Sequence, residues 1–189
     1  MTALIVIAIV IVVVLFYGIA IYNSLVEKRA RCEEAWSGIE VQLKRRHNLI
    51  PNLVETVKGY AAHESETLEN VIRARNSAIS ADSNNPSETA TMEGVLTGAL
   101  RQIFALSEAY PDLKANTNFL DLQEQLQSIE DEIQMSRRFY NGTARDYNVV
   151  VDSFPSNIVA GQFTFEKRDY FELDPTEAAE VRKVPKVSF

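Results

Sequence analysis

The sequence contains few of the residues that mark several common protein classes. Its 189 residues include one cysteine, Cys32, which cannot form an internal disulfide and fits a reducing compartment. Seven glycines and six prolines are few for a β fold with many turns, and this scarcity favours long helices. A formal net charge of −7 disfavours nucleic acid as a partner, because the phosphate backbone attracts a basic face.

The usual signatures of catalysis and metal binding are missing. Neither histidine, His47 or His63, has a glutamate three residues before it, and no HExxH motif occurs, so we expect both at a helix surface or rim. There is no GxSxG, P-loop or GxGxxG motif. Glu33 and Glu34 follow Cys32 and are expected to raise its pKa. We therefore expect no catalytic residue, cofactor or metal, and a protein that is not an enzyme.

What the sequence does contain is one long uncharged run at residues 3–22, ALIVIAIVIVVVLFYGIAIY. Twenty helical residues span roughly 30 Å, the thickness of the bilayer hydrocarbon. A cleaved signal peptide fits less well, because no basic residue precedes the run, the run is too long and no small-x-small site follows it. The run predicts a single membrane span whose partner is the lipid bilayer.

The charges beside the span predict its orientation. No basic residue precedes it, whereas Lys28, Arg29 and Arg31 follow closely. The positive-inside rule then places a short N-terminus, 1–2, outside and the rest of the chain in the cytoplasm.

Beyond the span, apolar residues recur at spacings of three and four, which predicts long amphipathic helices. One helix follows the span, with a stripe that runs to Tyr60. A second covers 64–80 with Leu68, Ile72 and Ile79 inward, a third covers 87–110, and the last stripe runs from Phe119 to Phe154. Three or four such helices with short connections predict an antiparallel, coiled-coil-like bundle at 23–160. The fold class is therefore all-α, with an extended tail at 161–189 that packs on its own bundle or on a neighbour.

The segment RRHNLIPNLVETVKGYAAHE, 45–64, places Pro51 inside a helical pattern. The stripe keeps its phase on both sides, so the helix is either bent but continuous or broken into two. Arg46 falls on the apolar stripe. It pairs with a buried acceptor, reaches a partner subunit, or covers apolar surface with its stem.

Several long motifs resemble the LemA family of bacterial membrane proteins. They are the segment above, RRFYNGTARDYN at 137–148, FPSNIVAGQFTF at 154–165 and the closing KVPKVSF. The resemblance implies a helical bundle behind one anchor in the inner membrane, and it supplies no enzyme activity. The motif positions, taken as candidates for packing or assembly, are Arg45, Arg46, Asn48, Pro51, Asn52, Tyr140, Asn141, Asp146, Tyr147, Asn148, Phe154, Pro155 and Asn157.

Two functions remain open at this point. The first is a non-enzymatic, membrane-anchored homo-oligomer that forms a scaffold at the cytoplasmic face, with a role in envelope maintenance implied by the resemblance. The second is an adaptor or regulatory subunit for another membrane protein, such as a membrane protease.

Overall fold

The computed structural model describes residues 1–172, and these form helices without strands. The helices are α1 (Thr2–Lys58), α2 (Ser65–Ser80), α3 (Pro86–Ser107), α4 (Pro111–Lys114), α5 (Thr117–Asp152) and α6 (Ser156–Gln162). The all-α prediction is confirmed. The rest of the predicted tail, 173–189, lies outside the described residues.

The chain divides into two compact units. The first, called unit 1, joins Met1–Ser37 with Arg138–Arg168, so it combines the two ends of the described chain. The second, unit 2, comprises Gly38–Arg137 and, among the described residues, 169–172. Helices α1 and α5 each contribute residues to both units.

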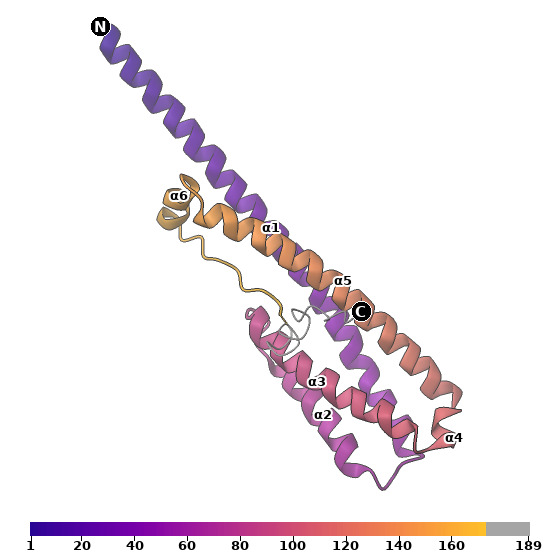
Figure 1. Ribbon diagram of the computed structural model, residues 1–189. Helices are drawn as coiled ribbons and strands as arrows, with labels where there is room; N and C mark the ends of the chain where they lie inside the picture. Colours follow the sequence, from indigo (N-terminus) through magenta and orange to yellow (C-terminus); the bar gives the residue numbers. More distant parts are fainter. Residues whose placement is uncertain (173–189) are drawn as a thin grey trace, which may run out of the picture. The chain divides into compact units, whose positions relative to one another are not determined.

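Unit 2 is a helical bundle with a continuous apolar core. The core takes Ile50, Leu53 and Val57 from α1, and it takes further side chains from α2, α3, α4 and α5. Figure 1 shows α2 and α3 side by side. The turn before α3 forms as expected from its sequence, because Asn85 caps the helix by accepting a hydrogen bond from the Glu88 amide and Pro86 occupies the first turn.

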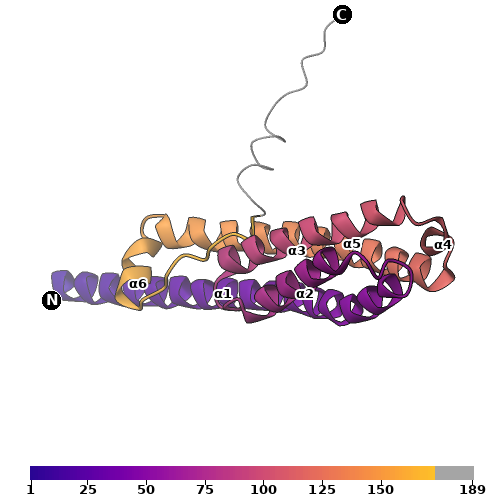
Figure 2. The same cartoon turned by 90° about the horizontal axis from the view of Figure 1, so that it is seen from below.

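Unit 1 packs residues 18–37 of α1 against the end of α5, α6 and the segment that follows α6. Its buried side chains include Leu25, Cys32, Tyr140, Tyr147 and Phe165. Figure 2 shows α6 beside α1. Unit 1 therefore holds the end of the apolar run together with residues 138–148 and 154–165, which carry two of the motifs.

The structure resolves the alternatives at Pro51 and corrects three inward positions. Helix α1 continues through Pro51 as one helix. Ile79 was predicted inward but is 51% exposed, because α2 buries the smaller Ala74 and Ala78 instead. Tyr60 and Phe154 were placed on buried stripes, but each lies beyond the end of its helix and is exposed.

Candidate functional site

The most unusual feature of unit 2 is a set of polar side chains inside its bundle, here called the polar cluster: Arg46, His47, Glu93, Thr97 and Glu130. Arg46 Nη1 lies 3.3 Å from Glu93 Oε2 and 3.4 Å from Glu130 Oε2. Its Nη2 donates to the Thr97 hydroxyl at 2.6 Å, and His47 Nε2 lies 2.6 Å from Glu93 Oε1. The polar cluster links α1, α3 and α5.

Burial makes these contacts important for the fold. The Arg46 and Glu93 side chains are 6% and 2% exposed. A charge at such a position is tolerated only when it is paired and its hydrogen-bonding groups are satisfied. Every buried side-chain nitrogen and oxygen in the described part of the chain has a partner. The first of the three alternatives for Arg46, a buried acceptor, is the one the structure adopts.

A second contact explains how α1 accommodates Pro51. A proline has no amide hydrogen, so the carbonyl four residues earlier, that of His47, loses its helical donor. Nε of Arg75, from α2, donates to this carbonyl at 2.8 Å. The helix therefore continues because a side chain from a neighbouring helix replaces the missing backbone donor.

This contact gives a testable prediction. Arg75→Leu is expected to lower the free energy of unfolding by about 1–3 kcal/mol, because it leaves a partly buried carbonyl unpaired. In a Pro51→Ala background the same substitution should cost less, since the restored amide at position 51 can donate to His47. Chemical unfolding of the four variants, followed by circular dichroism, measures the coupling. Equal costs of Arg75→Leu in both backgrounds would contradict the explanation.

Three other motif positions on α1 lie on the outside of unit 2. Arg45, Asn48 and Asn52 are exposed on one face of α1. Beside them, α1 and α5 border an open groove of about 490 Å³, here called the polar groove. It is lined by Arg45, Asn48, Leu49, Gln125, Ser128, Ile129 and Glu132.

In unit 1 the motif tyrosines form core contacts. Tyr140 is 2% exposed, and its ring lies 5.2 Å from that of Trp36. Tyr147 is 1% exposed. Both side chains pack within their own chain. A charge introduced at Tyr147 would therefore test folding.

In unit 1, Asn148 on α5 binds the backbone of the segment that follows α6. Its Nδ2 donates to the Arg168 carbonyl at 2.9 Å, and its Oδ1 accepts from the Arg168 amide at 2.8 Å. The Arg168 guanidinium in turn donates to Glu33 on α1 at 2.7 Å. These three contacts fix the segment after α6 to both long helices of unit 1.

Burial also sets the titration of two groups in unit 1. Burial is the main cause of the raised pKa of the Cys32 thiol. A hydrogen bond with Thr143 and the positive charge of Arg168 lower this pKa, but less than burial raises it. Glu33 contributes to the rise, as expected, but less than burial does. Burial likewise raises the pKa of Tyr147. A neutral thiol is a poor nucleophile, so this environment favours a structural Cys32.

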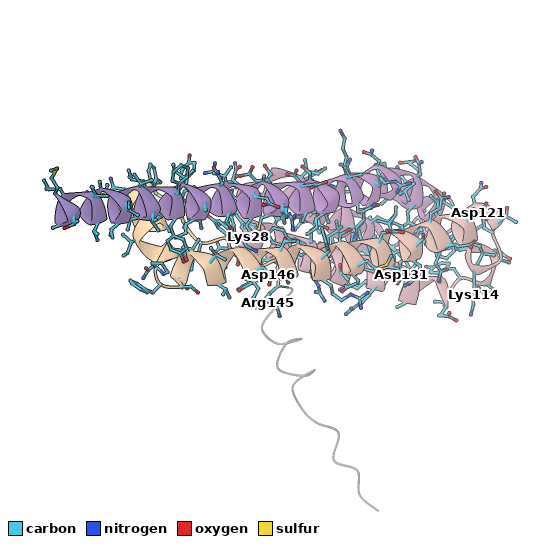
Figure 3. All side chains as sticks on the ribbon, turned by 90° about the horizontal axis from the view of Figure 1, so that it is seen from above. Lys28, Lys114, Asp121, Asp131, Arg145 and Asp146 are labelled. Atoms are coloured by element: carbon cyan, nitrogen blue, oxygen red, sulfur yellow. The ribbon has the colours of Figure 1, made fainter. Side chains whose placement is uncertain are left out.

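The remaining motif residues are more exposed. Asp146 lies 3.6 Å from Arg145, and Figure 3 shows both on the side of α5 that faces away from α1. Phe154 and Asn157 are exposed, whereas Asn141 and Pro155 are half-buried. Within neither unit are the motif residues gathered into one site.

The partners of Arg46 were missed in the sequence, although Glu93 carried a signal. Glu93 lies three residues from both Ala90 and Leu96, which are buried on α3. A carboxylate at an apolar helical position is the natural partner for an arginine at another such position. Glu130, the first of three consecutive acidic residues on α5, is 27% exposed. His47 was expected at the surface or rim and is 12% exposed.

Comparisons with known proteins identify relatives that match most of this chain. Protein LemA of Metamycoplasma hominis is 30% identical over 164 residues, which cover 86% of this chain and 71% of that protein. Magnetosome protein MamQ 2 of Paramagnetospirillum magneticum is 26% identical over an alignment of 178 residues, which covers 82% of this chain. Magnetosome protein MamQ of Magnetospirillum gryphiswaldense is 25% identical over the same length. The chain spans 65% of the length of each magnetosome relative.

The family match covers Gly38–Arg137 of unit 2 and Arg138–Arg168 of unit 1, but not the chain before residue 35. Residues 35–189 match the sequence profile of the LemA family, which takes in the polar cluster, the Asn148 contacts and α6. Together with the relative at 30% identity, this match establishes that the chain belongs to the LemA family.

Proposed function

We propose that this protein is a non-enzymatic, membrane-anchored scaffold that self-associates at the cytoplasmic face of a bacterial inner membrane. The anchor is the first part of α1. An 18-residue window of this helix has a mean hydropathy of 3.3, and none of that window is buried inside the protein. Lipid is the solvent that such a surface requires.

The charges beside the anchor support the orientation. Lys28, Arg29 and Arg31 follow the apolar run, and no basic side chain precedes it. By the positive-inside rule this charge difference supports a cytoplasmic location of both units. We propose that this scaffold takes part in maintenance of the cell envelope.

The observation that carries self-association is an exposed apolar pair on α5. Met135 and Phe139 lie one helical turn apart and are 48% and 64% exposed. The inward face of the same helix is already filled by residues such as Ile133 and Tyr140. Neighbouring exposed apolar side chains of this size favour contact with another protein surface. A second copy of the chain offers the same pair.

The test is the mass of the detergent-extracted full chain, measured by light scattering. We expect a defined oligomer for the parent and a smaller particle for Phe139→Glu, because the new charge would be desolvated in the interface. Ile79→Glu is the matched control, since Ile79 is 51% exposed on α2 and should leave the mass unchanged. A monomeric parent would refute self-association.

The polar groove favours a second candidate, the adaptor for another membrane protein. Arg45 and Glu132 give it charges of both signs, which suit a polar segment of a partner. In this case Arg45→Glu should abolish capture of the partner, while Phe139→Glu should not. Deleting the tail is a less specific test, because Phe165 and Phe171 are buried in the fold.

A further inference from the structure

The strongest unexplained feature of unit 1 is the exposed apolar surface around α6. Phe154, Ile158 and Phe163 are 80%, 63% and 57% exposed. The opposite side of α6 is packed, because Ser156 and Ala160, one turn apart, are 8% and 2% exposed. The short helix thus presents apolar side chains outward although it has a well-buried inner face.

Ring contacts place this surface at the end of the predicted span. The Tyr22 ring lies 4.9 Å from the Phe163 ring and 5.6 Å from the Phe165 ring. The Arg29 guanidinium lies 5.1 Å from the centre of the Phe165 ring. Gly18 and Ile21 of α1 are half-buried in this region, although the residues before Gly18 are exposed. The α6 region therefore lies beside the last turns of the apolar run.

Both segments that meet at this contact, the end of the apolar run on α1 and the α6 region, are without charged residues. On α1 the first charged side chain is Glu27, and residues 153–165 also contain no charge. The charged side chains next to this segment are Asp152 before it and Glu166 after it. Asp152 pairs with Lys167 at 3.2 Å, and Arg168 pairs with Glu33 at 2.7 Å. The uncharged surface of α6 is thus continuous with that of the span.

We propose that residues 153–165 insert into the boundary between lipid headgroups and acyl chains, as a second membrane contact beside the span. Aromatic side chains are favoured at this depth, and an exposed apolar helix face gains free energy by entering it. Lys167 and Arg168 are already paired within the protein, so the contact is with the apolar boundary and does not require anionic headgroups.

The inference rests on the membrane anchor of the proposed function, and it selects lipid over a second copy of the chain. The selection follows from continuity. A surface that adjoins the span at the level of Tyr22 meets the membrane before it can meet another protein. The contact would fix the rotation and tilt of unit 1 against the bilayer.

Tryptophan quenching by brominated lipid tests the insertion. The full chain with Trp36→Phe, which removes the single natural tryptophan, is reconstituted into phosphatidylcholine vesicles. Ile158→Trp is then expected to lose emission when the lipids carry bromine, and to lose more with bromine near the headgroup end of the acyl chain. Phe154→Trp provides a second reporter on the same surface.

The matched control is Phe139→Trp on α5, at an aromatic that is 64% exposed in the same unit. It lies 13 residues before the end of α5 at Asp152, which corresponds to about 20 Å along the helix. We expect brominated lipid to leave its emission unchanged. Quenching at Phe139 equal to that at Ile158 would overturn the proposal.

A reporter in the span separates failure of this inference from failure of the anchor. Phe16→Trp is expected to be quenched whenever the anchor crosses the bilayer. If it is quenched but Ile158→Trp and Phe154→Trp are not, the anchor stands and insertion of α6 is refuted. A blue-shifted, unquenched emission at position 158 would then identify a second copy as the occupant. If Phe16→Trp is not quenched, the anchor itself fails.

Discussion

Replacing Arg46 with leucine is expected to lower the free energy of unfolding by about 3–5 kcal/mol, because Glu93 would remain buried without its cationic partner. Glu93 is 2% exposed and cannot regain water without opening the bundle. Chemical unfolding of the full chain in mild detergent, followed by circular dichroism, measures the loss.

Two further variants isolate the pair. Arg45→Leu is the control, because Arg45 is the exposed neighbour of Arg46 on the same helix, and it should change stability by less than about 0.5 kcal/mol. Arg46→Leu combined with Glu93→Leu should be more stable than Arg46→Leu alone, since it removes the unpaired charge. Equal losses for Arg45→Leu and Arg46→Leu would show that burial of the pair has no energetic role.

Tyr147→Glu is expected to open unit 1, at a cost of about 3–5 kcal/mol or more. The substitution removes a ring that is 1% exposed and places a carboxylate where water is excluded. Tyr147→Phe keeps the ring and should cost no more than about 1.5 kcal/mol.

Cys32 provides the readout for this variant. It is the only cysteine in the chain and is 1% exposed within unit 1. Alkylation at mildly alkaline pH should be slow in the parent and in Tyr147→Phe, and fast in Tyr147→Glu. An unchanged alkylation rate in Tyr147→Glu would mean that the tyrosine does not hold unit 1 closed.

The titrations of Cys32 and Tyr147 give unit 1 an expected pH dependence. Both pKa values are raised in the fold, so both neutral forms are favoured there. Their contribution to stability is complete below the ordinary pKa values and is lost as pH rises through the raised ones. Unit 1 should therefore be less stable in alkaline solution than in neutral or mildly acidic solution.

The sequence predicts the helices well because their apolar spacing is regular. The expected helix at 64–80 is observed as Ser65–Ser80, and the last stripe becomes Thr117–Asp152. Periodicity alone does not rank small residues above large ones. For this reason Ile79 was expected inward, although Ala74 and Ala78 allow the neighbouring helix to approach closely.

Contacts between segments that are far apart in the sequence could not be predicted from the sequence. Arg46 pairs with Glu93, which is 47 positions away in the sequence. Asn148 pairs with the backbone of Arg168, which is 20 positions away and lies beyond α6. Helix α6 has seven residues, too few to show a period. Such contacts depend on how the helices pack, which one sequence does not specify.

The division of the chain has a consequence for synthesis. The central segment Gly38–Arg137 is continuous and supplies the helical core of unit 2, whereas unit 1 needs both Met1–Ser37 and Arg138–Arg168. At the usual translation rate of about 5–20 residues per second, the second half of unit 1 follows the first by about 5–20 seconds. During this interval the core of unit 2 can assemble while Leu25 and Cys32 still lack their partners. The core of unit 2 can therefore form before the two parts of unit 1 have both been synthesised.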